Sequence, residues 1–74
     1  MILTDGRHVI SDESPDELHR FAASIGLKRE WHQGDHYDLT ARRMLQKATR
    51  RGARTVSPRE IVNVLRRQRQ GARA

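Results

Sequence analysis

Apolar residues recur at helical spacing in three stretches of the chain. In the first stretch, four apolar side chains stand at positions i, i+3, i+4 and i+7, which places them on one face of a helix. These side chains are Leu18, Phe21, Ala22 and Ile25. The pattern predicts a helix over residues 15–25. Gly26 follows at the position where a left-handed residue usually ends a helix.

The second and third stretches show the same periodicity. The second predicts a helix over residues 40–51 that is ended by Gly52, with its apolar stripe at Ala41, Met44, Leu45 and Ala48. The third predicts a helix over residues 58–67, with apolar side chains at Ile61, Val62, Val64 and Leu65. Periodicity is lost after Leu65. We therefore predict a single domain of residues 1–67 followed by a basic, flexible tail of residues 68–74.

Two of the predicted helices share a start signal. The segments Ser14-Pro15-Asp16-Glu17-Leu18 and Ser57-Pro58-Arg59-Glu60-Ile61 both read Ser-Pro-x-Glu-apolar. The Ser hydroxyl can accept a hydrogen bond from the amide of the Glu. The Pro lacks an amide that would be unpaired at the first helical position, and the Glu side chain can reach back to the cap residue. We expect helices to begin at Pro15 and Pro58, and helix capping explains the likeness without a duplication.

Short segments between the predicted helices have β character. Residues 1–4 suit a buried strand, and residues 7–10 can pair with them as a hairpin arm around Asp5-Gly6. Residues 27–32 alternate in character, and residues 54–56 lead directly into the third helix. The predicted fold is a small α/β (or α+β) domain of three short strands alternating with three helices, with a sheet that is at least partly parallel. An all-helical alternative would leave the first and third of these segments poorly used.

Composition restricts the class of protein. A chain of 74 residues with 35% apolar side chains builds one domain with a thin core, and an obligate homodimer that hides more apolar surface also fits. The absence of Cys excludes disulfides and thiolate zinc sites. Apolar runs of at most three residues exclude a membrane-spanning helix, and so short a run at the start is no secretory signal. We predict a cytoplasmic protein.

Charge is distributed very unevenly along the chain. The first 38 residues hold four basic and eight acidic side chains, a net charge of −4, whereas the last 36 hold eleven and one, a net of +10. One end of the chain can therefore attract an anionic partner that the other end would repel.

The basic half contains the candidate phosphate contacts. Arg outnumbers Lys thirteen to two, and the guanidinium fork suits phosphate oxygens. A solvated helix face is the alternative explanation for such a run of charge. Few aromatic residues are free for base stacking and no helix-turn-helix pattern is clear, so binding would be mainly to the backbone of a nucleic acid. The candidates are Arg42, Arg43, Lys47, Arg50, Arg51, Ser57, Arg59, Arg66 and Arg67.

The densest polar cluster, residues 35–38, lies between the predicted strand 27–32 and the second helix. In an α/β sheet, ligands bind in loops that follow the carboxyl ends of strands. Asp5 follows the first strand, and Ser57 and Arg59 follow the third. If these strands are parallel neighbours, we expect Asp5, His36, Ser57 and Arg59 to meet at one edge of the sheet.

Candidate catalytic residues follow from this convergence. His36 would act as acid or base, Asp5 or Asp38 would orient it or hold a divalent metal, and Arg59 would pair with a phosphate. The whole candidate set is Asp5, His19, His36, Tyr37 and Asp38. Each residue also has a structural explanation: Asp38 could cap the second helix, His19 could pack at the margin of the first, and Tyr37 could point inward with its hydroxyl bonded.

Motifs with a defined chemistry are absent. His8 and His32 lack the spacing of a metal site, and there is no His-Glu-x-x-His, no phosphate-binding Gly-rich loop and no Gly-x-Ser-x-Gly. The sequence thus predicts no metal site and identifies no cofactor.

Several motifs along the chain carry a resemblance to a known family. In order they are Asp5; Val9-Ile10-Ser11-Asp12; Glu17-Leu18-His19-x-Phe21-Ala22; Ile25-Gly26-Leu27-x-Arg29-x-Trp31; His36-Tyr37-Asp38-Leu39; Gly52-Ala53; and Val56-Ser57-x-Arg59-Glu60-Ile61. Over residues 1–66 the chain resembles the bacterial and bacteriophage family known as domain of unknown function 4031. The resemblance implies a small intracellular protein, often phage-borne, with polar family positions at Asp5, His19, His36, Tyr37, Asp38, Ser57 and Arg59. The connection at residues 33–35 is shorter here than in relatives.

Three functions therefore stay open at this point. The first is a phage-type accessory protein that binds nucleic acid or another polyanion through the second helix and the tail. The second is a small enzyme or nucleotide-binding domain for phosphoester chemistry that uses Asp5, His36, Asp38 and Arg59. The third is an interaction module that docks on a host or phage protein, or that forms a homodimer.

Overall fold

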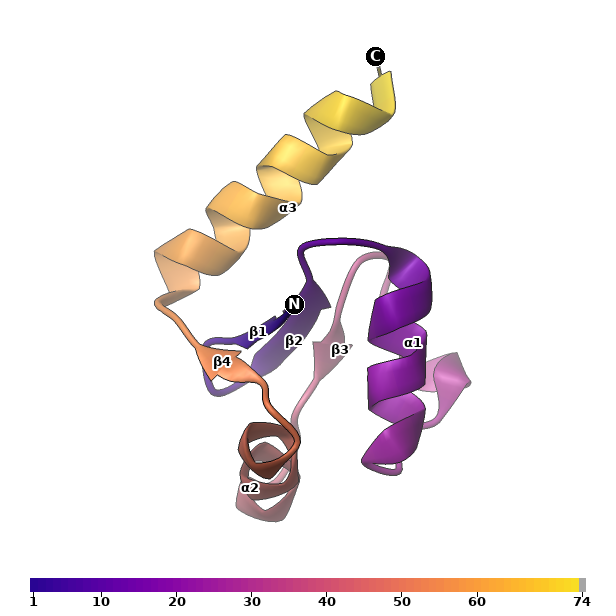
Figure 1. The fold of residues 1–74 in the computed structure, drawn as a ribbon, viewed down its shortest axis with the longest axis vertical. Helices are drawn as coiled ribbons and strands as arrows, with labels where there is room; N and C mark the ends of the chain where they lie inside the picture. Colours follow the sequence, from indigo (N-terminus) through magenta and orange to yellow (C-terminus); the bar gives the residue numbers. More distant parts are fainter. Residues whose placement is uncertain (74) are drawn as a thin grey trace.

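The computed structural model describes the backbone of residues 1–73 and the side chains of residues 1–71. Figure 1 shows the arrangement of the elements. In chain order they are β1 (Ile2–Thr4), β2 (His8–Ser11), α1 (Pro15–Ser24), the 3₁₀ turn η1 (Arg29–Trp31), β3 (Tyr37–Asp38), α2 (Arg42–Arg50), β4 (Arg54–Thr55) and α3 (Pro58–Arg73).

The four strands form one mixed sheet in the order β3-β2-β1-β4. β1 and β2 pair antiparallel as the predicted hairpin around Asp5-Gly6, and β3 pairs antiparallel with β2. β4 lies parallel to β1, with Leu3 opposite Arg54. The predicted small α/β domain with a partly parallel sheet is confirmed, with four strands rather than three.

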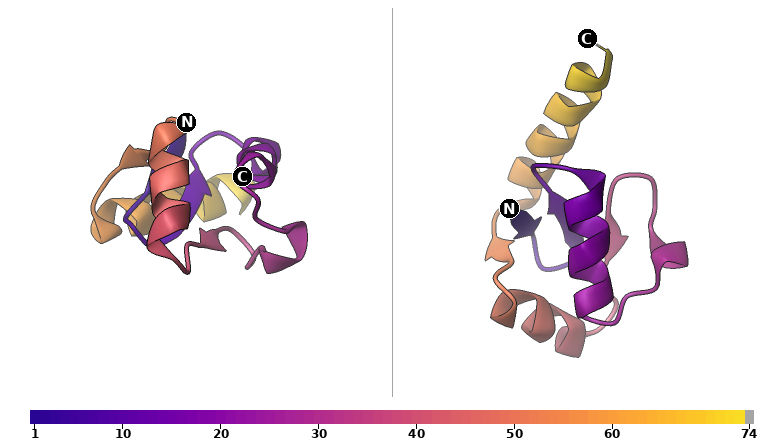
Figure 2. Two further views of the ribbon diagram at one scale, coloured as in Figure 1. Left: turned by 90° about the horizontal axis from the view of Figure 1, so that it is seen from below. Right: turned by 45° about the vertical axis from the view of Figure 1, so that its right-hand side comes forward.

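Side chains of the sheet alternate between two separate cores. Ile2 and Val9 belong to a larger core with α1 and α2, whereas Leu3 and Ile10 belong to a smaller core with α3. Because successive side chains of a strand point to opposite faces, the sheet is covered on both sides. Figure 1 shows the strands between α3 and α1, and the right-hand view in Figure 2 shows α2 and the end of α3 at opposite ends of the molecule.

Helix boundaries follow the local signals closely. The Ser14 and Ser57 hydroxyls each accept a hydrogen bond from the amide of the Glu three residues later, at 3.1 Å in both cases. Gly26 and Gly52 have φ of 87° and 101°, and the amide that follows each of them donates to a carbonyl five residues earlier. The predicted starts of α1 and α3 and the predicted ends of α1 and α2 are confirmed.

The expected strand over residues 27–32 is wrong. After the turn at Gly26, Leu27 enters the larger core and residues 29–31 form the turn η1, with Trp31 49% exposed. The strand forms at Tyr37–Asp38 instead, where the Tyr37 side chain is only 1% exposed and the backbone pairs with β2. Burial of this large side chain against the edge of the sheet favours pairing there, and the segment at residues 27–32 has no neighbouring strand.

Two expectations about α2 and α3 also need correction. α2 begins after Ala41, which makes no side-chain cap, so Asp38 does not cap this helix. Asp38 lies in β3, where it faces histidines rather than helix amides. α3 continues to Arg73, past the predicted end at Arg67, and Nε2 of the Gln68 side chain donates to the Ser11 carbonyl at 2.6 Å. Flexibility of residues 68–74 stays a prediction, and Ala74 lies outside the described residues.

None of the helices formed by residues 1–73 combines the length and apolar character needed to cross a membrane.

Candidate functional site

The turn between β1 and β2 is organised by Asp5, whose side chain is 5% exposed. Its Oδ1 accepts from the amides of Arg7 and His8 at 2.9 and 2.7 Å, and its Oδ2 lies 2.9 Å from Nδ1 of the His8 ring. Burial alone would raise the Asp5 pKa, but these hydrogen bonds outweigh it and hold the pKa below the usual value. An ionised Asp5 can only accept, so the Nδ1 of His8 is the donor.

Pairing of β2 with β3 brings His8 opposite Asp38. With its Nδ1 committed to Asp5, the His8 ring turns Nε2 toward Asp38, whose Oδ1 lies 3.9 Å away. The His36 ring presents its own Nε2 to the same oxygen at 3.5 Å. The two rings meet edge to face with 5.3 Å between their centroids. One carboxylate oxygen therefore faces two imidazole nitrogens.

His36 is oriented in the same way as His8. Its Nδ1 lies 2.7 Å from Oδ1 of Asp35, and the other oxygen of Asp35 accepts from Arg69 of α3 at 3.1 Å. Burial would raise the Asp35 pKa, but the hydrogen bonds from His36 and Arg69 outweigh burial and lower it. Arg69 thus ties the end of α3 to this edge of the sheet.

Asp38 stands at the centre of the arrangement. Its Oδ2 accepts from the Gln33 side chain at 2.9 Å, which fixes the carboxylate plane. Its Oδ1 is shielded from solvent and finds no hydrogen-bond partner among the described residues. We call the five residues that are linked here the Asp–His chain. They are Asp5, His8, Asp38, His36 and Asp35.

A cavity of about 230 Å³ adjoins the Asp–His chain. Asp5, His8, Asp35 and His36 line one side of it, and α3 lines the other. The lining residues from α3 are Pro58, Ile61, Val62, Leu65 and Arg69. Four residues of the Asp–His chain therefore border a small, mainly apolar pocket, and Arg69 places one positive charge at its wall.

A second group of aromatic polar residues lies on the opposite face of β3. His19 Nδ1 is 2.7 Å from the hydroxyl of the buried Tyr37, and the His19 and His32 rings meet edge to face with centroids 4.6 Å apart. Burial, followed by the nearby charge of His19, lowers the His32 pKa. We call these three residues the His–Tyr cluster. The structural explanations for His19 and Tyr37, packing with a bonded hydroxyl, are confirmed.

The expected convergence at one sheet edge is only partly found. Asp5, His36 and Asp38 come together, but Tyr37 and His19 lie across the strand from them because neighbouring side chains alternate. Ser57 caps α3. Arg59 is exposed and is not among the residues that line the cavity.

Sequence reasoning missed two members of the chain, His8 and Asp35. A local signal for His8 was available. An Asp at the first position of a turn can accept hydrogen bonds from the amides that follow it, and the residue three positions later then lies against its carboxylate. Asp35 lies next to His36 in the polar cluster of residues 35–38, whereas its contact with Arg69 depends on the position of α3, which no spacing indicates.

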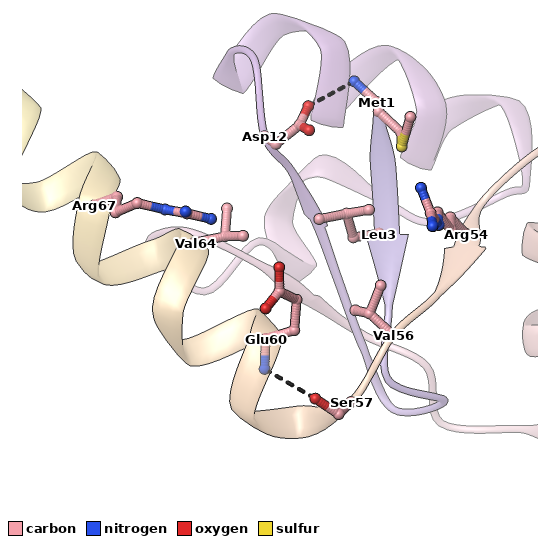
Figure 3. Close-up of a pocket in the computed structure, with 9 residues that line it drawn as sticks. All are labelled: Met1, Leu3, Asp12, Arg54, Val56, Ser57, Glu60, Val64 and Arg67. Carbon is pink, nitrogen blue, oxygen red and sulfur yellow. Dashed lines mark hydrogen bonds and ion pairs between the residues drawn. The ribbon is translucent and has the colours of Figure 1, made fainter.

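Figure 3 shows a different pocket, of about 570 Å³, between β1, β4 and α3. Arg54 and Arg67 line it, but so do Asp12 and Glu60. Dashed lines mark the bonds from the Met1 nitrogen to Asp12 and from the Glu60 amide to Ser57. Because acids offset the cations, this pocket is not specialised for an anion.

The basic side chains lie mostly outside these pockets, on the surface. Successive residues turn by about 100° around a helix, so four cations of α2 lie on the half of the helix opposite the centre of its apolar stripe. These four are exposed: Arg42, Arg43, Lys47 and Arg50. Arg51, which follows the helix, is exposed as well. Arg59, Arg66 and Arg67 of α3 are exposed as well. Among the side chains of residues 1–71, Arg69 is the only Lys or Arg that forms an ion pair with an acid.

Comparison with known proteins places the chain in a family. Residues 5–68 match the model of the family described as "Protein of unknown function (DUF4031)", and the chain belongs to this family. No curated protein and no solved structure matches the chain.

Proposed function

We propose that this protein binds nucleic acid through the basic surfaces of α2 and α3. The observation that carries the proposal is that, among the side chains of residues 1–71, no acid pairs with the cations of α2 or with Arg59, Arg66 and Arg67, which leaves these cations available to an external anion. Three acids of the first half are engaged elsewhere, with Asp5 and Asp35 on histidines and Glu17 on the Ser11 hydroxyl. A net charge of +6 thus acts mainly at the surface.

The arrangement of the two basic helices favours a long anion over a small one. In Figure 1, α2 lies at one end of the longest axis and the later turns of α3 lie at the other. The molecule extends 37 Å along this axis. A duplex rises 3.4 Å per base pair, so about eleven base pairs are needed to contact both helices. The contacts would be to phosphates and would carry little sequence information.

Salt dependence of binding tests the proposal. We expect a fluorescein-labelled 20-base-pair duplex to bind with a slope of log K against log salt of about −5, which corresponds to roughly six phosphate contacts. A duplex of six base pairs should bind more weakly per phosphate. A flat salt response, or no binding at low salt, would contradict the proposal.

A matched pair of variants separates a specific surface from net charge alone. Replacing Arg42, Arg43 and Lys47 by Gln removes three charges from α2, and we expect the salt slope to become less steep by about 3. Replacing Arg20, Lys28 and Arg29 by Gln removes three exposed charges from the other half of the chain and should leave the slope nearly unchanged. Equal effects of the two triple variants would mean that only net charge matters.

Other expectations stay proposals alongside this one. We propose a cytoplasmic, phage-type accessory role on the family resemblance. Sedimentation of the pure chain with and without duplex distinguishes a monomer that binds nucleic acid from a homodimer. If the chain self-associates and binds no duplex, the role of an interaction module for a host or phage protein is favoured instead.

A further inference from the structure

At the centre of the Asp–His chain, hydrogen-bond acceptors face one another without a donor between them. Because Asp5 and Asp35 each accept from a histidine Nδ1, the neutral form of each ring has its lone pair on Nε2. Both Nε2 atoms face the shielded Oδ1 of Asp38, which is itself an acceptor without a partner. Three hydrogen-bond acceptors thus face one another with no hydrogen between them, and buried acceptors are rarely left without a partner.

The geometry points to a divalent metal ion as the missing partner, held by Nε2 of His8, Nε2 of His36 and Oδ1 of Asp38. We propose this site as a separate property of the protein, independent of nucleic-acid binding at the basic helices. One ligand atom from each of His8, His36 and Asp38 can be chosen so that all three lie within 4.8 Å of one another. Two imidazoles and one carboxylate suit zinc, iron(II), cobalt or manganese better than calcium or magnesium.

The spacing of the ligand atoms supports the assignment. Tetrahedral ligands about 2.1 Å from a metal are about 3.4 Å apart. The His36 Nε2 and Asp38 Oδ1 atoms are already 3.5 Å apart, and the His8 Nε2 lies 3.9 Å from the same oxygen. These distances are too long for good hydrogen bonds, but a small rotation of the His8 ring would complete a coordination triangle.

The groups behind the ligands also match a metal site. Metal-binding histidines almost always donate their second ring nitrogen to a carboxylate or carbonyl, which sets the tautomer and the ring orientation. His8 has Asp5 for this purpose and His36 has Asp35. Asp38 is held by Gln33 through its other oxygen. Every ligand is therefore oriented before a metal arrives, from β2, β3 and the segment just before β3.

Three protein ligands leave open coordination positions for a further ligand. The adjoining cavity of about 230 Å³ is lined by His8 and His36, two of the three ligands, and Arg69 supplies a positive charge at its wall. A water molecule or a phosphate oxygen is the ligand class that this combination of a metal and an Arg would take. The site revises the enzymatic hypothesis, because His8 and Asp35 enter the set while His19, Tyr37 and Arg59 leave it.

The alternative explanation is a proton in place of the metal. An imidazolium at His8 or His36 would donate from Nε2 to Asp38 and satisfy the same oxygen without any ion. The two explanations differ in a measurable way, because only the first predicts stoichiometric uptake of a metal with both rings as ligands.

The primary experiment uses the tag-free, full-length wild-type chain, stripped with a chelator and titrated with Co²⁺ and with Zn²⁺ in the absence of nucleic acid. We expect one ion per chain, with visible Co²⁺ absorption typical of four or five ligands. On Zn²⁺ addition, ¹⁵N spectra of the histidine rings should show Nε2 of His8 and His36 shifting, with His19 and His32 unchanged. No saturable binding, or shifts at all four rings, would overturn the proposal.

Variants assign the ligands. His36→Gln should weaken Co²⁺ binding more than 100-fold, and Asp5→Asn, which keeps the turn but weakens the support of His8, should weaken it 10- to 100-fold. His32→Gln is the matched control, because it removes an equally common metal ligand from the His–Tyr cluster, and it should change affinity less than twofold. Binding that survives His36→Gln, or that His32→Gln abolishes, contradicts the assignment.

Circular dichroism of each variant checks that it is folded. Failure of the metal titration leaves the duplex-binding proposal standing, and the reverse also holds.

Discussion

The two faces of β3 carry groups built from the same residue type but with opposite surroundings. On the face toward α3, the Asp–His chain contains two histidines and three carboxylates, and the shielded Oδ1 of Asp38 has no hydrogen-bond partner among the described residues. On the face toward α1, the His–Tyr cluster supplies two histidines with a hydroxyl inside the larger core. Neighbouring carboxylates, rather than the number of histidines, therefore distinguish the group that we propose for a cation.

The largest expected difference between the faces concerns the neighbours Tyr37 and Asp38. Tyr37→Ala removes a fully buried ring from the larger core and should lower the free energy of unfolding by about 3–5 kcal/mol. Asp38→Ala in chelator should cost less than about 1 kcal/mol, because the lost bond to Gln33 is offset by removal of the unpaired oxygen. Urea unfolding of both variants measures the difference, and equal costs would remove the distinction between the faces.

Acid should destabilise the α3 side of the sheet in particular. The pKa values of Asp5 and Asp35 are lower in the folded chain than their usual 3.8, so the folded state binds fewer protons than the unfolded state. Their contribution is therefore complete above about pH 5 and is lost as the pH falls through the folded values. Urea midpoints between pH 3 and 6 should fall less steeply in the Asp5→Asn, Asp35→Asn double variant. An unchanged slope would show that these two carboxylates do not carry the acid dependence.

The His–Tyr cluster should show a smaller dependence of stability on pH, which arises from a histidine rather than from carboxylates. The His32 pKa lies below its usual 6.5 in the folded chain, so protonation of His32 favours the unfolded state. In chelator, stability should decline slightly as the pH falls from about 6.5 to the folded pKa, and His32→Gln should remove that decline. Thermal melts at half-unit pH steps measure it. If His32→Gln leaves the decline intact, another group is responsible.

Helix positions were the most predictable part of the fold. The starts of α1 and α3 depend on one hydroxyl and the amide three residues later, and the ends of α1 and α2 depend on a glycine with positive φ. All of these interactions form within six residues, so they can be read from the chain directly. β3 could not be predicted in this way because two residues carry no period, and its partner β2 lies about thirty residues away.

The candidate site, too, was predictable only where its features are local in the sequence. The pattern of residues by itself determined that Asp5, His36 and Asp38 are polar positions beside predicted strands, and that the cations gather in the second half of the chain. That His8 faces Asp38, and that Tyr37 lies on the other face, depends on how the strands pair. Strand register sets which side chains stand opposite each other, and a shift of one residue exchanges the two faces. Arg69 reaches Asp35 because α3 packs along the same edge, an outcome of core burial that no local spacing encodes.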